Sequence, residues 1–284
     1  MNRRFTAAAV FVLAAGPRLL LAAEPVPLMV LTPQTARVGK PLVLRVDDDS
    51  GIARDSDIRV IVRFRGDQEL VEPRVDPASK SKTWRFTPRG AGTYVISTSI
   101  EPTSASRTDR LFQYEKMIVV VAPDGPVTDV PARPSASAIA RFGHRLEIDS
   151  MVDPSCLMIG GVLPVRIKFD GKTMKNMELV VACRPTEVLA GAKPVPAGPA
   201  GEGGGGPTAD VTRTFKCDTG ENDFARIPIR DAGRWILVAE HKPDADGVRI
   251  RPGDRFVATL EFRVNRPKAE AGRSENRPAD KRGE

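Results

Sequence analysis

Apolar and polar residues alternate with a period of two along much of the chain. Residues 58–64 place Ile, Val, Val and Phe on one side and Arg59 and Arg63 on the other, and residues 163–169 repeat the pattern with Leu, Val, Ile and Phe. Because successive side chains of a strand point to opposite faces, each run predicts a β-strand with one buried face.

The same pattern predicts a series of further strands, and no stretch with apolar residues at three-and-four spacing competes with them. They are expected at residues 27–31, 38–46, 84–88, 94–97, 117–121, 179–183, 212–217, 224–229, 235–239 and 256–264. Many short strands separated by turn residues are typical of antiparallel sandwiches. The predicted fold class is therefore all-β, with two tandem immunoglobulin-like antiparallel β-sandwiches.

Two stretches of the chain resemble each other and suggest an internal duplication. Arg89–Ser97 and Arg230–Val238 both carry Ala-Gly before an aromatic residue and an apolar strand, 141 residues apart. The earlier strands of the two halves align at an offset of 121 residues. An insertion of about 20 residues, the length of the Gly- and Pro-rich loop at 189–210, explains the change of offset. Chance similarity between β-rich strings is the alternative.

The domain boundaries follow from changes of composition. Residues 1–23 have the basic, apolar and small-residue parts of a secretory signal peptide, with cleavage expected after Ala23; an uncleaved anchor is the alternative. A Pro-rich linker at 123–141 separates the predicted sandwiches at 25–122 and 142–264. The highly charged tail at 265–284 has no apolar cluster and is expected to be disordered.

Removal of the signal peptide lowers the net charge of the chain. The formal net charge of +7 falls to +4 once Arg3, Arg4 and Arg18 leave with the signal peptide, and the remaining basic residues are interleaved with acids. The chain lacks the basic patch with aromatic residues that nucleic-acid binding needs. We therefore expect a periplasmic, secreted or cell-surface protein that contacts a membrane only through the signal peptide during export. We expect its partner to be a ligand or an envelope protein, and the sequence does not identify either.

The chain has three cysteines: Cys156, Cys183 and Cys217. Cys183 and Cys217 lie on predicted strands that flank the 189–210 loop, and the oxidising environment outside the cytoplasm permits a disulfide between them. Such a bond would stabilise the fold by about 3–4 kcal/mol by closing the intervening loop. Two buried thiols are the alternative.

Two groups of side chains are candidates for metal binding. His241 lies close in sequence to Asp244 and Asp246. These three residues are a candidate transition-metal site, because imidazole and carboxylate groups are common ligands of such metals. Asp47, Asp49 and Asp55 crowd one predicted loop and carry the hard oxygen ligands that Ca²⁺ prefers, without EF-hand spacing. An ordinary strand-end histidine and a solvated acidic loop are the alternatives.

Catalytic signals are missing from the sequence. It contains no G-x-S-x-G elbow, no HExxH and no CxxC, and only two histidines, His144 and His241. A Ser–His–Asp set from distant positions stays open, because its members need not be near one another in the chain. We expect a protein that is not an enzyme and that needs no cofactor.

Residues 142–264 resemble the second half of an exported bacterial family of unknown function, often described as nickel-uptake or metal-transport associated. The resemblance rests on Gly143–Ile148, Asp153-Pro154, Gly160–Lys172, Asp218–Ala225, Ala232–Trp235, His241 and Thr259–Phe262. Residues 114–116 also resemble the strand before the family's linker, and the second half is similar to transthyretin-like or carboxypeptidase-regulatory sandwiches. Family members tend to begin the mature chain with a His-containing segment, which residues 24–28 lack.

These observations lead to one expected function and two alternatives. The chain is expected to be a noncatalytic exported binding or accessory protein of the periplasm or cell surface. The first alternative is a structural or adhesion spacer, and the second is an accessory component of nickel or cobalt uptake, as the resemblance implies. A β-sandwich alone does not choose among them, because this fold hosts many unrelated functions.

Overall fold

The structure is a computed structural model that describes residues 29–32, 36–46, 56–75, 82–103, 110–124, 134–185, 213–220, 223–245 and 249–265. Apart from one 3-10 turn, η2 (Pro154–Cys156), the regular elements in these ranges are strands. None of their helical segments has the length and apolarity to cross a membrane. The predicted signal peptide, most of the charged tail and the loop at 189–210 lie outside the described ranges.

One large sheet runs through both halves of the chain. Its order is β14-β13-β16-β17-β9-β8-β4-β5, with the short β2 (Ala36–Arg37) beside β9. The strands from the first half are β4 (Ser56–Phe64), β5 (Asp67–Val71), β8 (Gly92–Pro102) and β9 (Leu111–Ala122). Those from the second half are β13 (Glu178–Pro185), β14 (Arg213–Asp218), β16 (Gly233–His241) and β17 (Arg255–Val264).

Each half adds a small sheet of its own. In the first half, β1 (Met29–Thr32), β3 (Leu42–Val46), β7 (Lys82–Phe86) and β6 (Pro73–Val75) form a four-stranded sheet in that order. In the second half, β11 (Val162–Phe169) pairs with β10 (Leu146–Ser150), β12 (Lys172–Thr173) and β15 (Ala225–Pro228). Each small sheet packs on part of the large one, which confirms the predicted β-sandwiches.

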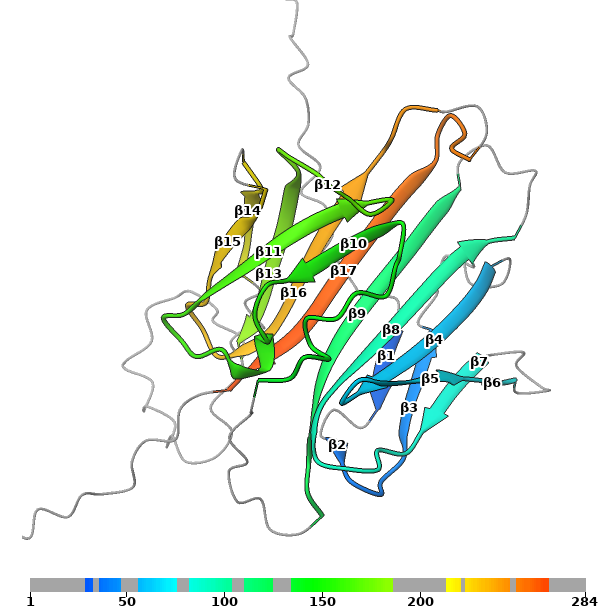
Figure 1. The fold of residues 1–284 in the computed structure, drawn as a ribbon, viewed down its shortest axis with the longest axis vertical. Helices are drawn as coiled ribbons and strands as arrows, with labels where there is room; N and C mark the ends of the chain where they lie inside the picture. The colour runs from blue at the N-terminus through cyan, green and yellow to red at the C-terminus, as the bar shows by residue number, and fades with distance from the viewer. Residues whose placement is uncertain are drawn as a thin grey trace, which may run out of the picture.

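The two sandwiches meet at a parallel strand pair, β9–β17. The pairing runs from Leu111 opposite Arg255 to Met117 opposite Glu261. Figure 1 shows β17 directly beside β9 in the middle of the large sheet, with β10 and β11 crossing in front. The tandem modules expected from the sequence are therefore not separated in space, because their strands share hydrogen bonds.

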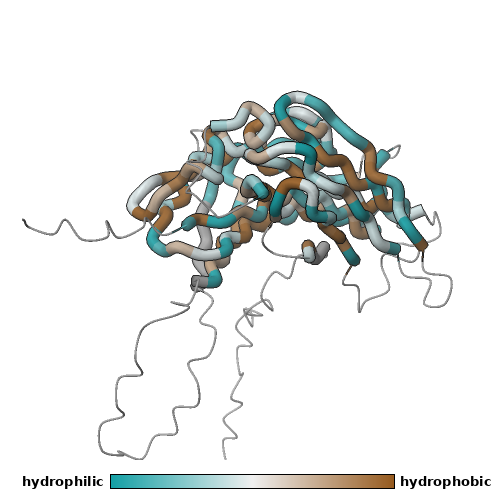
Figure 2. The backbone as a smooth tube through the Cα atoms, turned by 90° about the horizontal axis from the view of Figure 1, so that it is seen from below, coloured by the Kyte–Doolittle hydropathy of each residue, from teal (hydrophilic) through white to brown (hydrophobic). Residues whose placement is uncertain are grey.

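The small sheets lie on opposite faces of the large sheet. On β9, Met117, Val119 and Val121 belong to the core of the first half, whereas Phe112 and Ile118 belong to the core of the second half. Since odd and even positions of a strand point to opposite faces, β9 contributes one face to each core. Along the tube in Figure 2, hydrophobic and hydrophilic residues alternate in the strands.

Strand order corresponds between the halves. In each half, an early strand (β3 or β11) lies inside the small sheet and pairs with strands on both sides. In the large sheet, the order β5-β4-β8-β9 of the first half corresponds to β14-β13-β16-β17 of the second half. The equivalent strands β9 and β17 are parallel and the small sheets cover opposite faces, as a two-fold axis along the strands would arrange them. A duplication requires this correspondence, and the duplication itself stays a prediction.

The two Ala-Gly turns perform the same structural task. Gly92 and Gly233 begin β8 and β16 with φ values of 136° and 152°, which side chains rarely allow. A Cβ atom on Gly92 would also approach the Phe64 ring to 3.2 Å. Beyond each turn, Tyr94 and Trp235 are buried in the respective cores. The repeated motif therefore starts a core strand and supplies no exposed chemistry.

Candidate functional site

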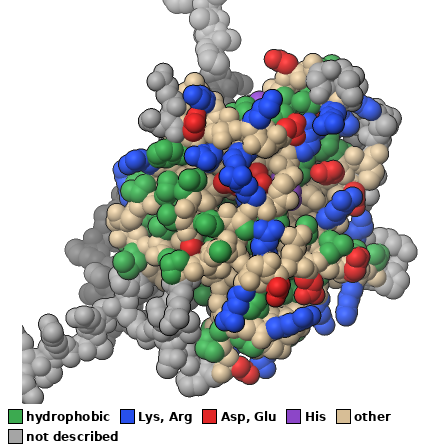
Figure 3. All heavy atoms as spheres, in the orientation of Figure 1, with side chains coloured by type: hydrophobic (Ala, Val, Ile, Leu, Met, Phe, Trp, Pro, Cys, Tyr) green, Lys and Arg blue, Asp and Glu red, His purple; other side chains and the backbone are tan. Residues whose placement is uncertain are grey.

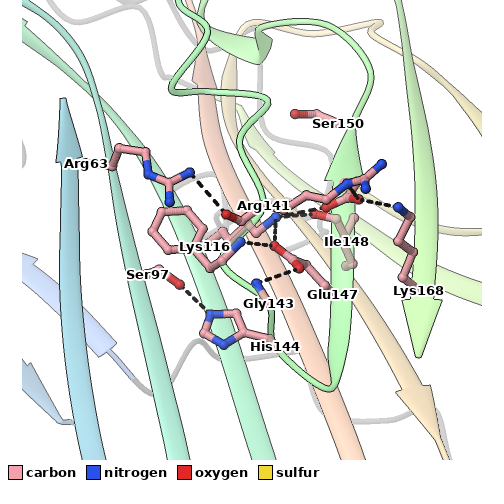
Figure 4. A network of polar contacts seen from close by, with 12 residues as sticks. Arg63, Ser97, Lys116, Arg141, Gly143, His144, Glu147, Ile148, Ser150 and Lys168 are labelled. Carbon is pink, nitrogen blue, oxygen red and sulfur yellow. Dashed lines mark hydrogen bonds and ion pairs between the residues drawn. The ribbon is translucent and has the colours of Figure 1, made fainter. Parts of the chain in front are cut away.

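The principal cluster of buried charges lies between the two sandwiches. Figure 4 shows its members converging from β9, β10, β11 and the segment that precedes β10. We call it the junction network; it consists of the buried Lys116, Glu147, Asp149 and Lys168 and of Arg141, whose side chain is 62% exposed. Its residues come from both halves, so the network connects the first sandwich to the second.

Lys116 is the centre of the junction network. Its ammonium group lies 2.5 Å from Glu147 Oε1 and 3.2 Å from Asp149 Oδ1, and it donates a hydrogen bond of 3.2 Å to the Ile148 carbonyl. An ammonium group has three donors, and all three find acceptors here. The side chain is only 7% exposed, so removing Lys116 would leave two buried carboxylates short of a cation.

The carboxylates have further partners. Glu147 accepts hydrogen bonds from the amides of Phe142 (2.8 Å) and Gly143 (3.2 Å). Burial alone would raise the pKa of the Glu147 carboxyl, but the charge and hydrogen bond of Lys116 together with the Phe142 amide lower it. Asp149 lies 3.1 Å from Arg141 Nε and 3.6 Å from Lys168 Nζ. Glu147 is therefore held as a carboxylate at neutral pH.

His144 lies beside the junction network, on the face of the large sheet that carries Ser97 and Tyr114. Its Nε2 is 2.5 Å from Ser97 Oγ, and its ring stacks on Tyr114 with centroids 5.0 Å apart. Burial lowers the pKa of the His144 imidazole to about 4. The charge of Glu147 raises this pKa, and the charge of Lys116 lowers it further. The ring is therefore neutral at physiological pH.

The segment before β10 is fastened to the first sandwich by Arg63 of β4. Its guanidinium carbon lies 4.5 Å from the centre of the Phe142 ring, and Nη1 donates a hydrogen bond of 3.1 Å to the Arg141 carbonyl. Together with Ser97–His144 and Lys116–Glu147, these contacts place residues 141–149 against β4, β8 and β9. The junction therefore combines main-chain pairing with side-chain contacts.

The predicted metal ligands are only partly within the described ranges. His241, at the end of β16, lies edge-on to Phe169 with ring centroids 4.6 Å apart, and burial lowers its pKa. No group of three or more His, Cys, Asp or Glu residues suited to a metal ion occurs among the described residues. Asp246, Asp47, Asp49 and Asp55 lie outside them, so both metal sites stay predictions.

The expected disulfide between Cys183 and Cys217 does not fit the strand register. Their strands β13 and β14 pair as anticipated, but Cys217 is opposite Leu179 and Cys183 is opposite Arg213. The two cysteines are thus four residues apart along paired strands, or about 13 Å, whereas a disulfide needs Cα atoms within about 7 Å. The pairing was wrong because sequence spacing does not fix register. Cys156, the third cysteine, is half-buried at the end of η2, and burial raises the pKa of its thiol.

The junction network was not predicted from the sequence, although its residues leave a signal there. Glu147 and Asp149 alternate with Leu146 and Ile148, and Lys116 interrupts an apolar strand. Charged residues within such runs indicate either an exposed face or buried pairing. The chain alone does not show which, because the partners come from strands far apart in sequence.

The geometry defines an all-β protein in which two sandwiches share one sheet and a buried charge network. A family model described as Domain of unknown function (DUF4198) matches residues 62–243, more than half of the chain, and the chain belongs to this family. The match contains every residue of the junction network. It confirms the resemblance to a family of unknown function, and the family description names neither a metal nor an activity.

Further comparisons add little to this assignment. No curated protein matches the chain. The solved structures to which it is similar include the D0-D1 domain of intimin, at 11% identity over 83% of this chain and 97% of that chain, with a TM-score of 0.21. The adhesin InvE of Yersinia pseudotuberculosis is 14% identical over 83% of this chain, which spans 59% of InvE, with a TM-score of 0.21. Both TM-scores are too low to indicate a common overall arrangement.

Proposed function

We propose that the chain is a noncatalytic, exported binding or accessory protein whose two sandwiches act as one rigid body. The β9–β17 pairing carries this proposal, because hydrogen bonds from Leu111–Arg255 to Met117–Glu261 leave no hinge between the halves. The junction network fixes the same interface from one side of the sheet. A rigid body of this kind holds its surfaces in a constant relative orientation, which suits a scaffold for binding.

The one serine–histidine contact described above is poorly suited to catalysis, which supports the noncatalytic assignment. Ser97 is 1% exposed, so a substrate cannot reach its hydroxyl without opening the junction. A histidine with a pKa of about 4 is also a weak base at neutral pH. The contact is better explained as the satisfaction of two buried polar groups.

A structural or adhesion spacer is a second candidate, favoured by the same rigidity. The two candidates differ in whether a surface binds a partner. Among the described residues, no observation favours the metal-uptake alternative. An exported location is supported by the basic, apolar and small-residue pattern of residues 1–23.

Export can be tested by expressing the full chain in a bacterium and sequencing the N-terminus of the protein recovered outside the cytoplasm. We expect a mature chain that begins at Glu24, because Ala23 ends the small-residue segment. A matched variant, Ala23→Arg, should accumulate uncleaved. Recovery of full-length wild-type chain solely from the cytoplasm would contradict the proposed location.

A further inference from the structure

Exposed apolar side chains are concentrated in one loop of the second sandwich. Of the nine large hydrophobic residues that are exposed in the described ranges, five lie within residues 151–162, here called the apolar loop: Met151, Val152, Met158, Ile159 and Val162. Figure 3 shows hydrophobic side chains gathered over the start of β11 and the loop before it. Such a local concentration on a soluble surface marks an interaction site.

The apolar loop is held rigidly by Asp153. This carboxylate caps η2, accepting hydrogen bonds from the Ser155 amide (2.8 Å) and hydroxyl (2.7 Å), and it also accepts one from the Ser135 amide (2.8 Å). Ser155 Oγ lies 3.1 Å from Thr93 Oγ1 of β8. The base of the loop is therefore fixed to both halves of the molecule.

The tip of the apolar loop is fixed as well. Gly161 N donates to Met158 O (3.0 Å), which closes a tight turn, and Gly160 has a φ of 89°. Two more hydrogen bonds join the turn to the residue after β15: Gly160 N to Ile229 O (2.8 Å) and Ile229 N to Gly161 O (2.9 Å). Met158, 66% exposed, is thus presented to solvent on an ordered turn, which reduces the entropy lost on binding.

The charge around the apolar loop is positive. Within residues 151–162 and 224–230 the one acid is Asp153, which is buried and already hydrogen-bonded. Exposed Arg226 and Arg230 lie on the neighbouring β15 and just after it, and Asp231 follows at partial exposure. Apolar side chains flanked by arginine are the combination that binds the interface of an anionic bilayer.

A second copy of the chain fits this surface less well. Stable protein interfaces use about 20–30 residues from each partner, whereas the apolar loop offers five exposed apolar side chains on a projecting turn. Insertion into a lipid interface needs no matching surface. We propose that the apolar loop docks the protein on an anionic lipid surface, with Met158 and Ile159 entering the apolar layer and Arg226 and Arg230 facing the headgroups.

This inference rests on the proposed exported binding function and names its partner class. It differs from the expectation that the mature chain contacts no membrane. The sequence does not reveal this contact, because five apolar side chains separated by Gly, Pro and polar residues do not form the long apolar segment that is typical of a membrane span.

The test is sedimentation of the exported, mature protein with vesicles of phosphatidylglycerol and phosphatidylethanolamine, compared with phosphatidylcholine vesicles. We expect the wild type to bind the anionic vesicles and the double variant Met158→Asp/Ile159→Asp to lose at least about tenfold in partition coefficient, because two charges replace inserted apolar groups. Arg230→Glu should weaken binding to anionic vesicles alone. The matched control is Leu70→Asp, since Leu70 is comparably exposed on β5, away from the loop; it should bind like the wild type.

The inference would be overturned by no binding of the wild type, by equal binding of the double variant with native circular dichroism, or by equal loss in Leu70→Asp. Self-association that the double variant abolishes, without vesicle binding, would assign the loop to a protein contact and would also overturn it. None of these outcomes bears on export or on the rigidity of the two sandwiches, so failure here is distinguishable from failure of the proposed function.

Discussion

Replacing Lys116 with methionine should lower the free energy of unfolding by about 3–5 kcal/mol, because a buried cation is removed while its anionic partners remain. Glu147 and Asp149 would then lie at 4% and 6% side-chain exposure without the Lys116 ammonium group. The Ile148 carbonyl would also lose its donor. Denaturant unfolding followed by circular dichroism at neutral pH measures the change.

A second substitution separates charge from packing. Adding Glu147→Gln to Lys116→Met removes one of the stranded carboxylates and should recover part of the loss, so that the two changes are not additive. Lys242→Met is the matched control, because Lys242 pairs with Glu240 at the surface, where both side chains are substantially exposed. It should change stability by less than about 1 kcal/mol. A similarly small effect of Lys116→Met would contradict the assigned role of the network.

Mild acid should destabilise the fold through His144. The pKa is about 4 in the folded protein and 6.5 in the unfolded chain, so between these values the unfolded state binds a proton that the folded state excludes. The free energy of unfolding should therefore fall as pH decreases from 6.5 to about 4, by up to about 3 kcal/mol. Urea unfolding across this range measures the slope.

Two variants identify the histidine responsible. His144→Phe keeps an aromatic ring against Tyr114 and Phe142 but cannot be protonated, and it should remove most of the slope. His241→Asn should remove only a minor part, although burial lowers that pKa as well. Glu147 acts at lower pH: its pKa is depressed on folding, so the stability it provides is lost below its ordinary value of 4.5. An unchanged slope in His144→Phe would contradict the assignment.

The strands could be predicted from sequence because their signal is local. Alternation at 58–64 and 163–169 corresponds to β4 and β11, and the Ala-Gly turns open β8 and β16. The nine-stranded sheet could not be predicted, since β9 and β17 are separated by more than 130 residues and pairing depends on three-dimensional position. One sign was available: Met117–Val121 is continuously apolar, which is typical of a strand buried on both faces.

The site was harder to predict than the fold. His144 was noted as one of two histidines, but its contact with Ser97 joins residues 47 positions apart. Lys116 meets Glu147 and Asp149 across the predicted linker, which suggested separate modules. The Cys183–Cys217 prediction failed for the related reason that a local pattern fixes which face a residue occupies but leaves strand register open.

The central claim, that the two sandwiches form one rigid unit, can be tested with the two tryptophans. Trp84 is fully buried in the first core and Trp235 is nearly so in the second, and the chain contains no other tryptophan. In Trp235→Phe the fluorescence reports the first sandwich, and in Trp84→Phe it reports the second. Denaturant unfolding of each variant is followed by fluorescence and by far-ultraviolet circular dichroism together. One rigid unit predicts that the two signals coincide in midpoint and slope within each variant; a fluorescence transition separated from the dichroism transition in either variant would contradict it.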